Sequence, residues 1–351
     1  MNTTVFSPRS SVSAAGKSPC IVCCTSAKEN WCWLQENLQS QSREWHLCDD
    51  RPRGLLERLI RFPNLAAMRA SWQAVRRAKR NQADLLVSTN PTLTFWCAIF
   101  AVLHQAHTYH VAWSFHLSKL PGGIQYLLAQ WVYSTVDRLI VYSRAERQIY
   151  SEHFGIASVR FEMHHWGAAV PQVKPSQPLE PGEYVCVVSQ QPQDYQTLMS
   201  AIALVPDIPV VLVVPRGRAI AAKIAPNVTL RTGLSQANRL NILRHSRFLV
   251  MPIRHARVSC DYATLVAAMQ MGKTFVVSDL PSVSDYAFHN SNALLCPPTN
   301  PEVLAIAIRE LWNNLVKCEI LGENGQEFAA VFCSEASSRH DFHQLLVRRG
   351  L

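Results

Sequence analysis

Short apolar runs rich in β-branched residues alternate with longer stretches of helical periodicity along most of the chain. In the first half, these runs predict strands near residues 20–25, 45–48, 84–88, 108–114 and 138–142. In the second half, six runs predict strands: YVCVVS, VVLVV, NVTLR, RFLVMP, TFVVSD and ALLCP. Buried strands that alternate with helices are typical of parallel βα units, so the pattern predicts an α/β fold with doubly wound sheets.

One segment between the two series of strands has little periodicity. It runs from Gly167 to Glu183, GAAVPQVKPSQPLEPGE, and its proline content is typical of a linker. We therefore predict a flexible N-terminus at 1–18, a first domain at 19–166, a linker at 167–183, a second domain at 184–335 and a C-terminal helix at 336–351. Two such domains imply a cleft, in which ligands bind beyond the carboxyl ends of the strands.

The glycine motifs of two common nucleotide-binding classes are missing. No GxGxxG follows the first predicted strand, which disfavours a nicotinamide-dependent dehydrogenase. Neither GxxxxGKS nor GxxxxGKT occurs, which disfavours a P-loop enzyme. The comparable stretch LPGG at 120–123 predicts the entry to a helix.

The composition fits two ordinary domains with a basic surface. Of the 351 residues, 48% are hydrophobic and 17% are charged, which allows substantial cores. The net charge of +9 favours a polyanionic partner such as nucleic acid, an anionic membrane or a phosphorylated ligand. We predict no nucleic-acid partner, because no recognisable binding motif or set of stacking aromatic residues accompanies the charge.

Basic residues concentrate between positions 51 and 80. Nine Arg or Lys residues and one acidic residue alternate there with apolar residues of helical segments. This pattern is typical of a surface that lies on anionic lipid, and the alternative is a solvated helix face.

Neither an export signal nor a membrane span is predicted. The longest apolar run, 95–103, is much shorter than the ~20 residues that span a bilayer, so it predicts a buried helix or strand. The first 18 residues lack the apolar core of a signal peptide. We expect a cytoplasmic protein, with peripheral attachment at the inner face of the membrane as the option left open.

The eleven cysteines are scattered from Cys20 to Cys333 and form no regular framework, which predicts reduced and mostly buried thiols. A metal site around CIVCC and Cys32 is the alternative, but no second CxxC or HxxxH follows. The pair Asp49 and Asp50 has no further acidic residues beside it. We therefore expect no metal and no cofactor.

Several segments together carry a resemblance to a known family. They are VDRLIVYSRAERQIYSEHFGI at 136–156, FEMHHWGAAVP next, QDYQTLMSAIALVP at 193–206, NVTLRTGLSQANRLNILRHSRFLVMP at 227–252, and AAMQMGKTFVVSDLPSVSDYAFHNSNALLCPPTNPEVLAIAIREL. In these segments the chain resembles the family-4 retaining glycosyltransferases, or glycosyl transferases group 1, which have the GT-B fold. The resemblance implies two Rossmann-like domains facing a cleft, with the acceptor on the side of 19–166 and a nucleotide-sugar donor on 184–335. It also implies that the helix at 336–351 packs back on the first domain.

The resemblance implies a donor site that has lost its usual charges. A donor diphosphate gains negative charge as its bond to the sugar breaks, so a site without metal needs cations and helix-terminal amides. The family's Arg and Lys in the loop after the first strand of the second domain correspond to Gln190 and Gln193. The family's two glutamates correspond to Ser259 and Ala267. Asp261 is the nearby acid that substitutes in part if the loop shifts.

The candidate site residues follow from these correspondences and from the strand ends. For donor binding they are Ser189, Gln190, Gln193, Arg216, Arg218, Arg254, Cys260, Tyr262, Ala263 and Thr264. The arginines, together with His255 and Arg257, replace the lost cations in this hypothesis, and a plain basic surface is the alternative. The candidate catalytic residues are Asp261 and His116, which follows a strand and suits acid-base or hydrogen-bonding work. His164 and His165 are interpreted as structural residues of the linker region.

Two functional hypotheses follow. The first is a glycosyltransferase that moves a sugar from a nucleotide-diphosphate sugar to a glycan, lipid-linked or small-molecule acceptor, as in polysaccharide or glycolipid synthesis. The second is an inactive relative that binds a glycan, nucleotide or partner enzyme as a scaffold. The first rests on the resemblance, and the second rests on the replaced charges of the donor site.

Overall fold

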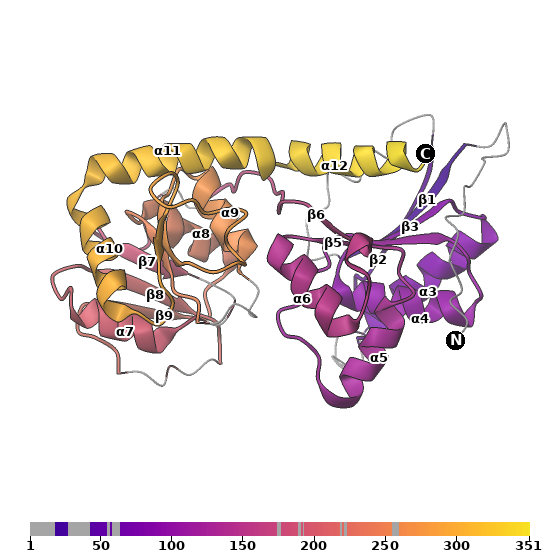
Figure 1. The fold of residues 1–351 in the computed structure, drawn as a ribbon, viewed down its shortest axis with the longest axis horizontal. Helices are drawn as coiled ribbons and strands as arrows, with labels where there is room; N and C mark the ends of the chain where they lie inside the picture. Colours follow the sequence, from indigo (N-terminus) through magenta and orange to yellow (C-terminus); the bar gives the residue numbers. More distant parts are fainter. Residues whose placement is uncertain are drawn as a thin grey trace.

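The computed structural model describes residues 18–26, 43–54, 57, 64–173, 177–188, 191, 193–217, 220, 223–254 and 260–351. These residues form two lobes, each built around one six-stranded sheet (Figure 1). All strand pairs within the two sheets are parallel. The predicted fold class, two doubly wound α/β units, is confirmed.

The N-terminal sheet has the strand order β2-β1-β3-β4-β5-β6. Its elements are β1 (Cys20–Thr25), β2 (Glu44–Asp49), α3 (Leu65–Arg80), β3 (Leu85–Ser88), α4 (Pro91–Leu103), β4 (Tyr109–Ala112), α5 (Gly123–Tyr133), β5 (Arg138–Val141), α6 (Arg144–Phe154), η2 (Ser158–Arg160) and β6 (Phe161–Met163). The apolar run at 95–103 is helical, because Asn90 caps the preceding turn and Pro91 occupies the first helical position.

The C-terminal sheet has the order β12-β11-β10-β7-β8-β9. Its elements are β7 (Val185–Val188), α7 (Tyr195–Ala203), β8 (Val210–Val214), β9 (Val228–Thr232), α8 (Gln236–His245), β10 (Leu249–Met251), α9 (Tyr262–Gln270), β11 (Phe275–Ser278), β12 (Leu294–Cys296), α10 (Pro301–Asn313), α11 (Leu315–Phe332) and α12 (Glu335–Arg348). β7 and β8 are buried along their whole length, as expected for valine-rich strands with helices on both faces.

Helices α3, α4, α5 and α6 cover one face of the N-terminal sheet. Their apolar residues form two cores with the strands, one beneath α3 and α4 and one beneath α4, α5 and α6. The opposite face is covered by α12, whose Phe342, Leu345 and Leu346 pack on Ile21, Val87 and other strand residues. Figure 1 shows α11 over the C-terminal lobe and α12 continuing along the top onto the N-terminal lobe.

The chain passes between the lobes twice, and the two passages touch. The backbone N–H of Ala168 donates to the carbonyl of Cys333 (3.1 Å), and Ala168 also forms a bridge with Ser334. Beneath them, the amide of Gln270 donates to the carbonyls of Ala168 and Cys333. Gly167 lies so close to α12 that a Cβ atom there would be 2.0 Å from Oγ of Ser338. The passages therefore behave as one packed unit.

No helix among the described residues is long and apolar enough to cross a membrane.

Candidate functional site

Each sheet has one place where neighbouring strands connect in opposite directions, and ligands of such folds bind at the carboxyl ends there. In the C-terminal sheet this switch point lies between β7 and β10. The two loops that leave these strands are joined, because the backbone N–H of Asp194 donates to the carbonyl of Pro252 (2.9 Å). Gln193 lies in this loop, and its Oε1 is buried without a hydrogen-bond partner among the described residues. The predicted donor residues Ser189 and Gln190 lie outside the described residues.

Asp261 is the N-cap residue of α9 at this edge, and its carboxylate contacts Thr264 in the first turn of the same helix. Oδ1 accepts from the backbone N–H of Thr264 (3.1 Å), and Oδ2 lies 3.0 Å from the Thr264 hydroxyl. This is the geometry of an N-cap, which satisfies an amide that the helix would otherwise leave open. Both oxygens contact Thr264 and the residue is buried, and its catalytic role stays a prediction. The Thr264 amide is likewise not open to an anion.

The start of α7 repeats this arrangement. The sequences DYQTL at 194–198 and DYATL at 261–265 match at four of five positions. Asp194 caps α7 through the backbone N–H of Thr197 (3.2 Å) and its hydroxyl (2.8 Å). Helices α7 and α9 therefore both start with a carboxylate, which opposes the binding of a phosphate at their N-termini.

Tyr262 and Cys260 are fully buried, in contrast to the open donor contacts that the sequence predicted. The Tyr262 hydroxyl lies 2.9 Å from Oγ of Ser143 and 3.0 Å from the carbonyl of Ser282. Ser143 follows β5 in the N-terminal lobe, so this contact joins the carboxyl-end edges of both sheets. Ala263 stays exposed beside it.

Tyr286 makes a second contact of the same kind. Its hydroxyl donates to the carbonyl of Tyr142 (2.8 Å) and accepts from the backbone N–H of Trp166 (2.8 Å). Nearby, the backbone N–H of Arg144 donates to Oδ2 of Asp285 (2.8 Å). The two lobes are therefore in direct hydrogen-bonded contact at the base of the cleft.

His116 pairs with Glu146 at the N-terminal side of this contact. Nδ1 of His116 lies 2.6 Å from Oε1 of Glu146, whose other oxygen accepts from the backbone N–H of Tyr142 (2.9 Å). Burial alone would lower the pKa of His116, but the charge and hydrogen bond of Glu146 and the charge of Asp261 outweigh it, so the pKa is raised. The imidazole is 18% exposed and its ring centroid lies 5.5 Å from that of Tyr262. His116 is thus a partly exposed hydrogen-bonding group beside the contact between the lobes.

The two predicted donor-site arginines that the structure describes, Arg216 and Arg254, lie in different places. Arg216 follows β8 and lines a cavity of about 200 Å³ with Arg239 of α8 and with residues 213–215, 233 and 234. Arg254 is exposed after β10 and does not line that cavity. Arg218, His255, Arg257 and the glutamate-equivalent Ser259 lie outside the described residues, while Ala267 is buried within α9.

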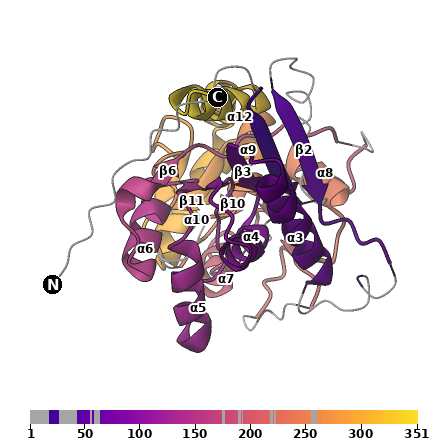
Figure 2. The same ribbon diagram turned by 90° about the vertical axis from the view of Figure 1, so that its right-hand side faces the viewer.

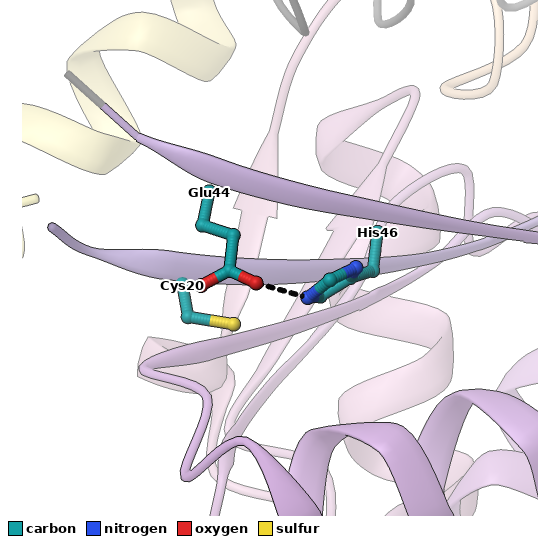
Figure 3. Close-up of side chains that lie close together, drawn as sticks. All are labelled: Cys20, Glu44 and His46. Atoms are coloured by element: carbon teal, nitrogen blue, oxygen red, sulfur yellow. Dashed lines mark ion pairs between the residues drawn. The ribbon is translucent and has the colours of Figure 1, made fainter. Parts of the chain in front are cut away.

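One group of side chains has the donor atoms of a metal site, and it lies away from the cleft. Single ligand atoms of Cys20, Glu44 and His46 lie within 4.8 Å of one another (Figure 3). Nε2 of His46 is 2.8 Å from the Glu44 carboxylate and 2.7 Å from the Asn81 amide. Cys20 and Glu44 are the first residues of their strands, so the group lies at the amino-end edge, opposite to the site. Cys32 lies outside the described residues.

Sequence reasoning missed Glu146, Arg239 and Tyr286. Ser143 and Glu146 have the S-x-x-E spacing of a capping box, and Oγ of Ser143 does accept from the backbone N–H of Glu146 (3.1 Å). That local signal places a carboxylate at the end of β5 but does not reveal its pairing with His116. Nothing in the spacing of Tyr286 indicates the contact with Tyr142.

Two family models match the chain, one in each lobe. Residues 40–167 match the model described as Glycosyltransferase Family 4, and residues 184–314 match the model described as Glycosyl transferases group 1. No curated protein matches the sequence.

Solved structures share the fold over nearly the whole chain. Sucrose-phosphate synthase from Thermosynechococcus elongatus is 13% identical with a TM-score of 0.65, over 94% of this chain and 98% of that chain. The HepE protein of Anabaena in complex with UDP-glucose is 14% identical with a TM-score of 0.64, over 94% and 99%. A UDP-forming trehalose-phosphate synthase from Burkholderia xenovorans is 12% identical with a TM-score of 0.62, over 95% and 100%.

Proposed function

Because the two domains of this chain belong to glycosyltransferase families, Glycosyltransferase Family 4 at 40–167 and Glycosyl transferases group 1 at 184–314, we propose that the protein transfers a sugar from a nucleotide-diphosphate sugar. The acceptor in this proposal is a glycan, a lipid-linked sugar or a small molecule. The donor is a substrate, and the proposal includes no metal or other cofactor.

The cavity beside Arg216 and Arg239 is the observation that carries the proposal. Two guanidinium groups at the carboxyl ends of β8 and β9 offer charge-assisted hydrogen bonds to a diphosphate. Arg216 follows β8, the strand next to β7, whose loop carries Gln190 and Gln193 in place of the family's Arg and Lys. The HepE structures contain UDP, UDP with glucose, and UDP-glucose, which supports a uridine nucleotide as the first donor to test.

His116 provides the second part of the proposed site. Nδ1 is held by Glu146, so Nε2 is the nitrogen that faces a substrate. In transfer, the bond between the sugar anomeric carbon and the diphosphate oxygen breaks, the acceptor hydroxyl oxygen forms the new bond to that carbon, and the hydroxyl proton passes to the released diphosphate. A protonated imidazole donates to an oxygen of the sugar or of the departing diphosphate and so positions or stabilises it. Asp261 caps α9, and its charge contributes to the raised pKa of His116.

A specific observation favours a second candidate, an inactive relative that binds without turnover. Asp194 and Asp261 cap α7 and α9, and Tyr262 occupies the gap between the lobes with a buried side chain. Both features weaken diphosphate binding at the switch point.

Calorimetric titration with UDP, GDP and their sugar conjugates tests the donor proposal. We expect binding by the wild type and a loss of affinity of about 100-fold or more in Arg216→Ala/Arg239→Ala, since each charge-assisted hydrogen bond contributes about 1.5–3 kcal/mol. Arg309→Ala is the matched control, because this arginine pairs with Asp207 at the exposed surface. A folded wild type that binds no nucleotide contradicts the proposal.

Turnover separates the two candidates. Release of UDP from a UDP-sugar, measured with mixed glycan and glycolipid acceptors, supports transfer, and His116→Ala should reduce it without abolishing nucleotide binding. Nucleotide binding with no turnover under any acceptor favours the inactive relative.

A further inference from the structure

Helix α5 exposes a continuous apolar stripe. Ile124 is 83% exposed, Leu127 61%, Leu128 47% and Trp131 51%. These positions are related as i, i+3, i+4 and i+7, which places them on one side of a helix. Ala129, Val132 and Tyr133 on the other side pack into the core beneath the helix, so the exposed stripe is additional to the packed face.

The stretch of sequence that contains the stripe has almost no charge. From Leu85 to Val136 the sequence contains one Asp, Glu, Lys or Arg, and it is Lys119. This range includes all of α4 and α5. Val102 and Leu103 at the end of α4, a helix that packs against α5, are also exposed. Isolated exposed leucines are ordinary, but a continuous patch of this kind marks an interaction surface.

Helix α3, which packs against α4, carries positive charge. It contains Arg69, Arg76, Arg77, Lys79 and Arg80 and no acidic residue. Lys79 donates to the carbonyl of His104 just after α4 (2.6 Å), which joins the basic end of α3 to the apolar end of α4. Figure 2 shows α3, α4 and α5 in one layer of the N-terminal lobe, and α5 extends furthest from the sheet in Figure 1.

We propose that this layer docks on an anionic lipid bilayer, with the α5 stripe inserted in the headgroup region and the α3 cations facing the headgroups. A charge-free helix with an exposed Trp and an acid-free basic helix, both packed against α4, together supply the apolar and basic parts of an interfacial membrane surface. A projecting ridge inserts into fluid lipid without a matching groove, which favours lipid over a protein partner. The stripe on α5 is the apolar anchor, and the basic helix contributes attraction at longer range.

The docked orientation bears on the proposed function. Residues 113–122 connect the carboxyl end of β4, where His116 lies, to the start of α5. Docking through α5 therefore places the cleft entrance near the bilayer, where a lipid-linked acceptor would reside. This second step rests on the proposed glycosyl transfer, whereas the docking itself does not.

Flotation with lipid vesicles tests the docking without any sugar nucleotide. Full-length protein is mixed with vesicles of phosphatidylcholine alone or with phosphatidylglycerol added, and the bound fraction is measured. We expect binding to the anionic vesicles, and a reduction of about 100-fold or more in Ile124→Gln/Leu127→Gln/Leu128→Gln, because each lost side chain lowers partitioning by about tenfold.

The matched control is Ile306→Gln/Val316→Gln/Ile320→Gln, which removes comparably exposed apolar side chains from the C-terminal lobe. We expect it to bind within about twofold of the wild type. High salt should weaken the wild type by screening the α3 cations while leaving measurable binding. Brominated lipid should quench wild-type fluorescence more than that of Trp131→Phe.

Three results overturn the docking proposal. They are a folded wild type that does not float with anionic vesicles, equal losses in the α5 variant and the control, and binding that high salt removes entirely. Self-association that depends on α5 in the absence of lipid would reassign the stripe to a protein interface.

Discussion

The two lobes are held together at two places by different kinds of interaction. Where the carboxyl-end edges of the sheets meet, the contact consists mainly of neutral hydrogen bonds from Tyr262 to Ser143 and from Tyr286 to Tyr142. Along α12, the contact combines the buried Phe342 with ion pairs of His164. The first contact involves a few side chains, whereas the second extends along α12, the last helix of the chain.

This difference indicates which contact responds to solution conditions. His164 lies 3.0 Å from Glu162 and 3.0 Å from Asp341 of α12, and Arg348 of α12 also pairs with Glu162. Ion pairs change with pH, and neutral hydrogen bonds change much less. The α12 contact should therefore weaken under alkaline conditions while the cleft contact remains.

Phe342→Ala is the largest expected perturbation. The ring is fully buried, with its centroid 5.2 Å from that of Trp113 and 6.1 Å from that of Trp45. Removing it from the core should cost about 3–5 kcal/mol of unfolding free energy, measured by chemical denaturation. Phe332→Ala, on the partly exposed end of α11, is the control and should cost less. Equal costs would show that α12 does not anchor the N-terminal lobe.

His164→Gln should have the next largest effect. Burial alone would lower the pKa of His164, but hydrogen bonds to Asp341 and Glu162 raise it to about 9. Because the folded pKa is above the ordinary value, the stabilisation is complete below about pH 6.5 and is lost as the pH rises through about 9. We expect a cost of about 2–3 kcal/mol near pH 6.

Denaturation of both proteins between about pH 6 and about pH 10 provides the check. The wild type should lose stability relative to the variant as the pH rises, so that the difference becomes small at the alkaline end. A difference that stays constant across this range would contradict the ionic interpretation.

Tyr262→Phe tests the cleft contact and should cost about 1–2 kcal/mol, because it removes a hydroxyl that two buried groups contact. The natural control is Tyr195→Phe, at the equivalent position of the repeated sequence on α7, where the side chain is half-buried and the cost should be within about 0.5 kcal/mol. The size of the Tyr262 effect should not depend on pH below about 9. Similar costs for the two tyrosines would show that the interlobe position adds nothing.

Arg144→Ala should have the smallest effect. Its side chain is 84% exposed and lies 3.3 Å from Asp285, so the ion pair is screened by solvent. The backbone N–H that donates to Asp285 is unchanged by the substitution. We expect a change below about 0.5 kcal/mol that disappears in high salt. A larger loss would mean that the cleft contact also depends on charge.

The sheets were predictable because their strands are buried on both faces and therefore read as short valine-rich or leucine-rich runs. β8 follows VVLVV closely, and β7 lies within YVCVVS. The run at 95–103 was ambiguous, because a buried helix and a buried strand are both apolar throughout. β6 was missed, since the three residues Phe161–Met163 are too few to show a period.

The site was less predictable because its contacts join distant parts of the chain. The strand ends alone indicated Arg216 at the ligand edge, whereas Gln193 was indicated by the family correspondence. Tyr262, however, meets Ser143 across 119 positions of sequence, and His116 meets Glu146 across 30. The cap formed by Asp261 is a local feature, but the family correspondence directed attention to its charge and not to the Thr264 that follows three positions later.

The contact of Gly167 with Ser338 has a mechanical consequence. The segment at Gly167 and Ala168 is hydrogen-bonded to the segment that leads into α12. The two connections between the lobes therefore form one hinge and not two independent ones. A side chain at 167 would push α12 outward at its first turn, and the rigid helix would carry that displacement along its length to Phe342. A small displacement at this hinge would thus become larger where α12 covers the N-terminal sheet. The absence of a Cβ atom at position 167 therefore sets how the N-terminal lobe is aligned with α12.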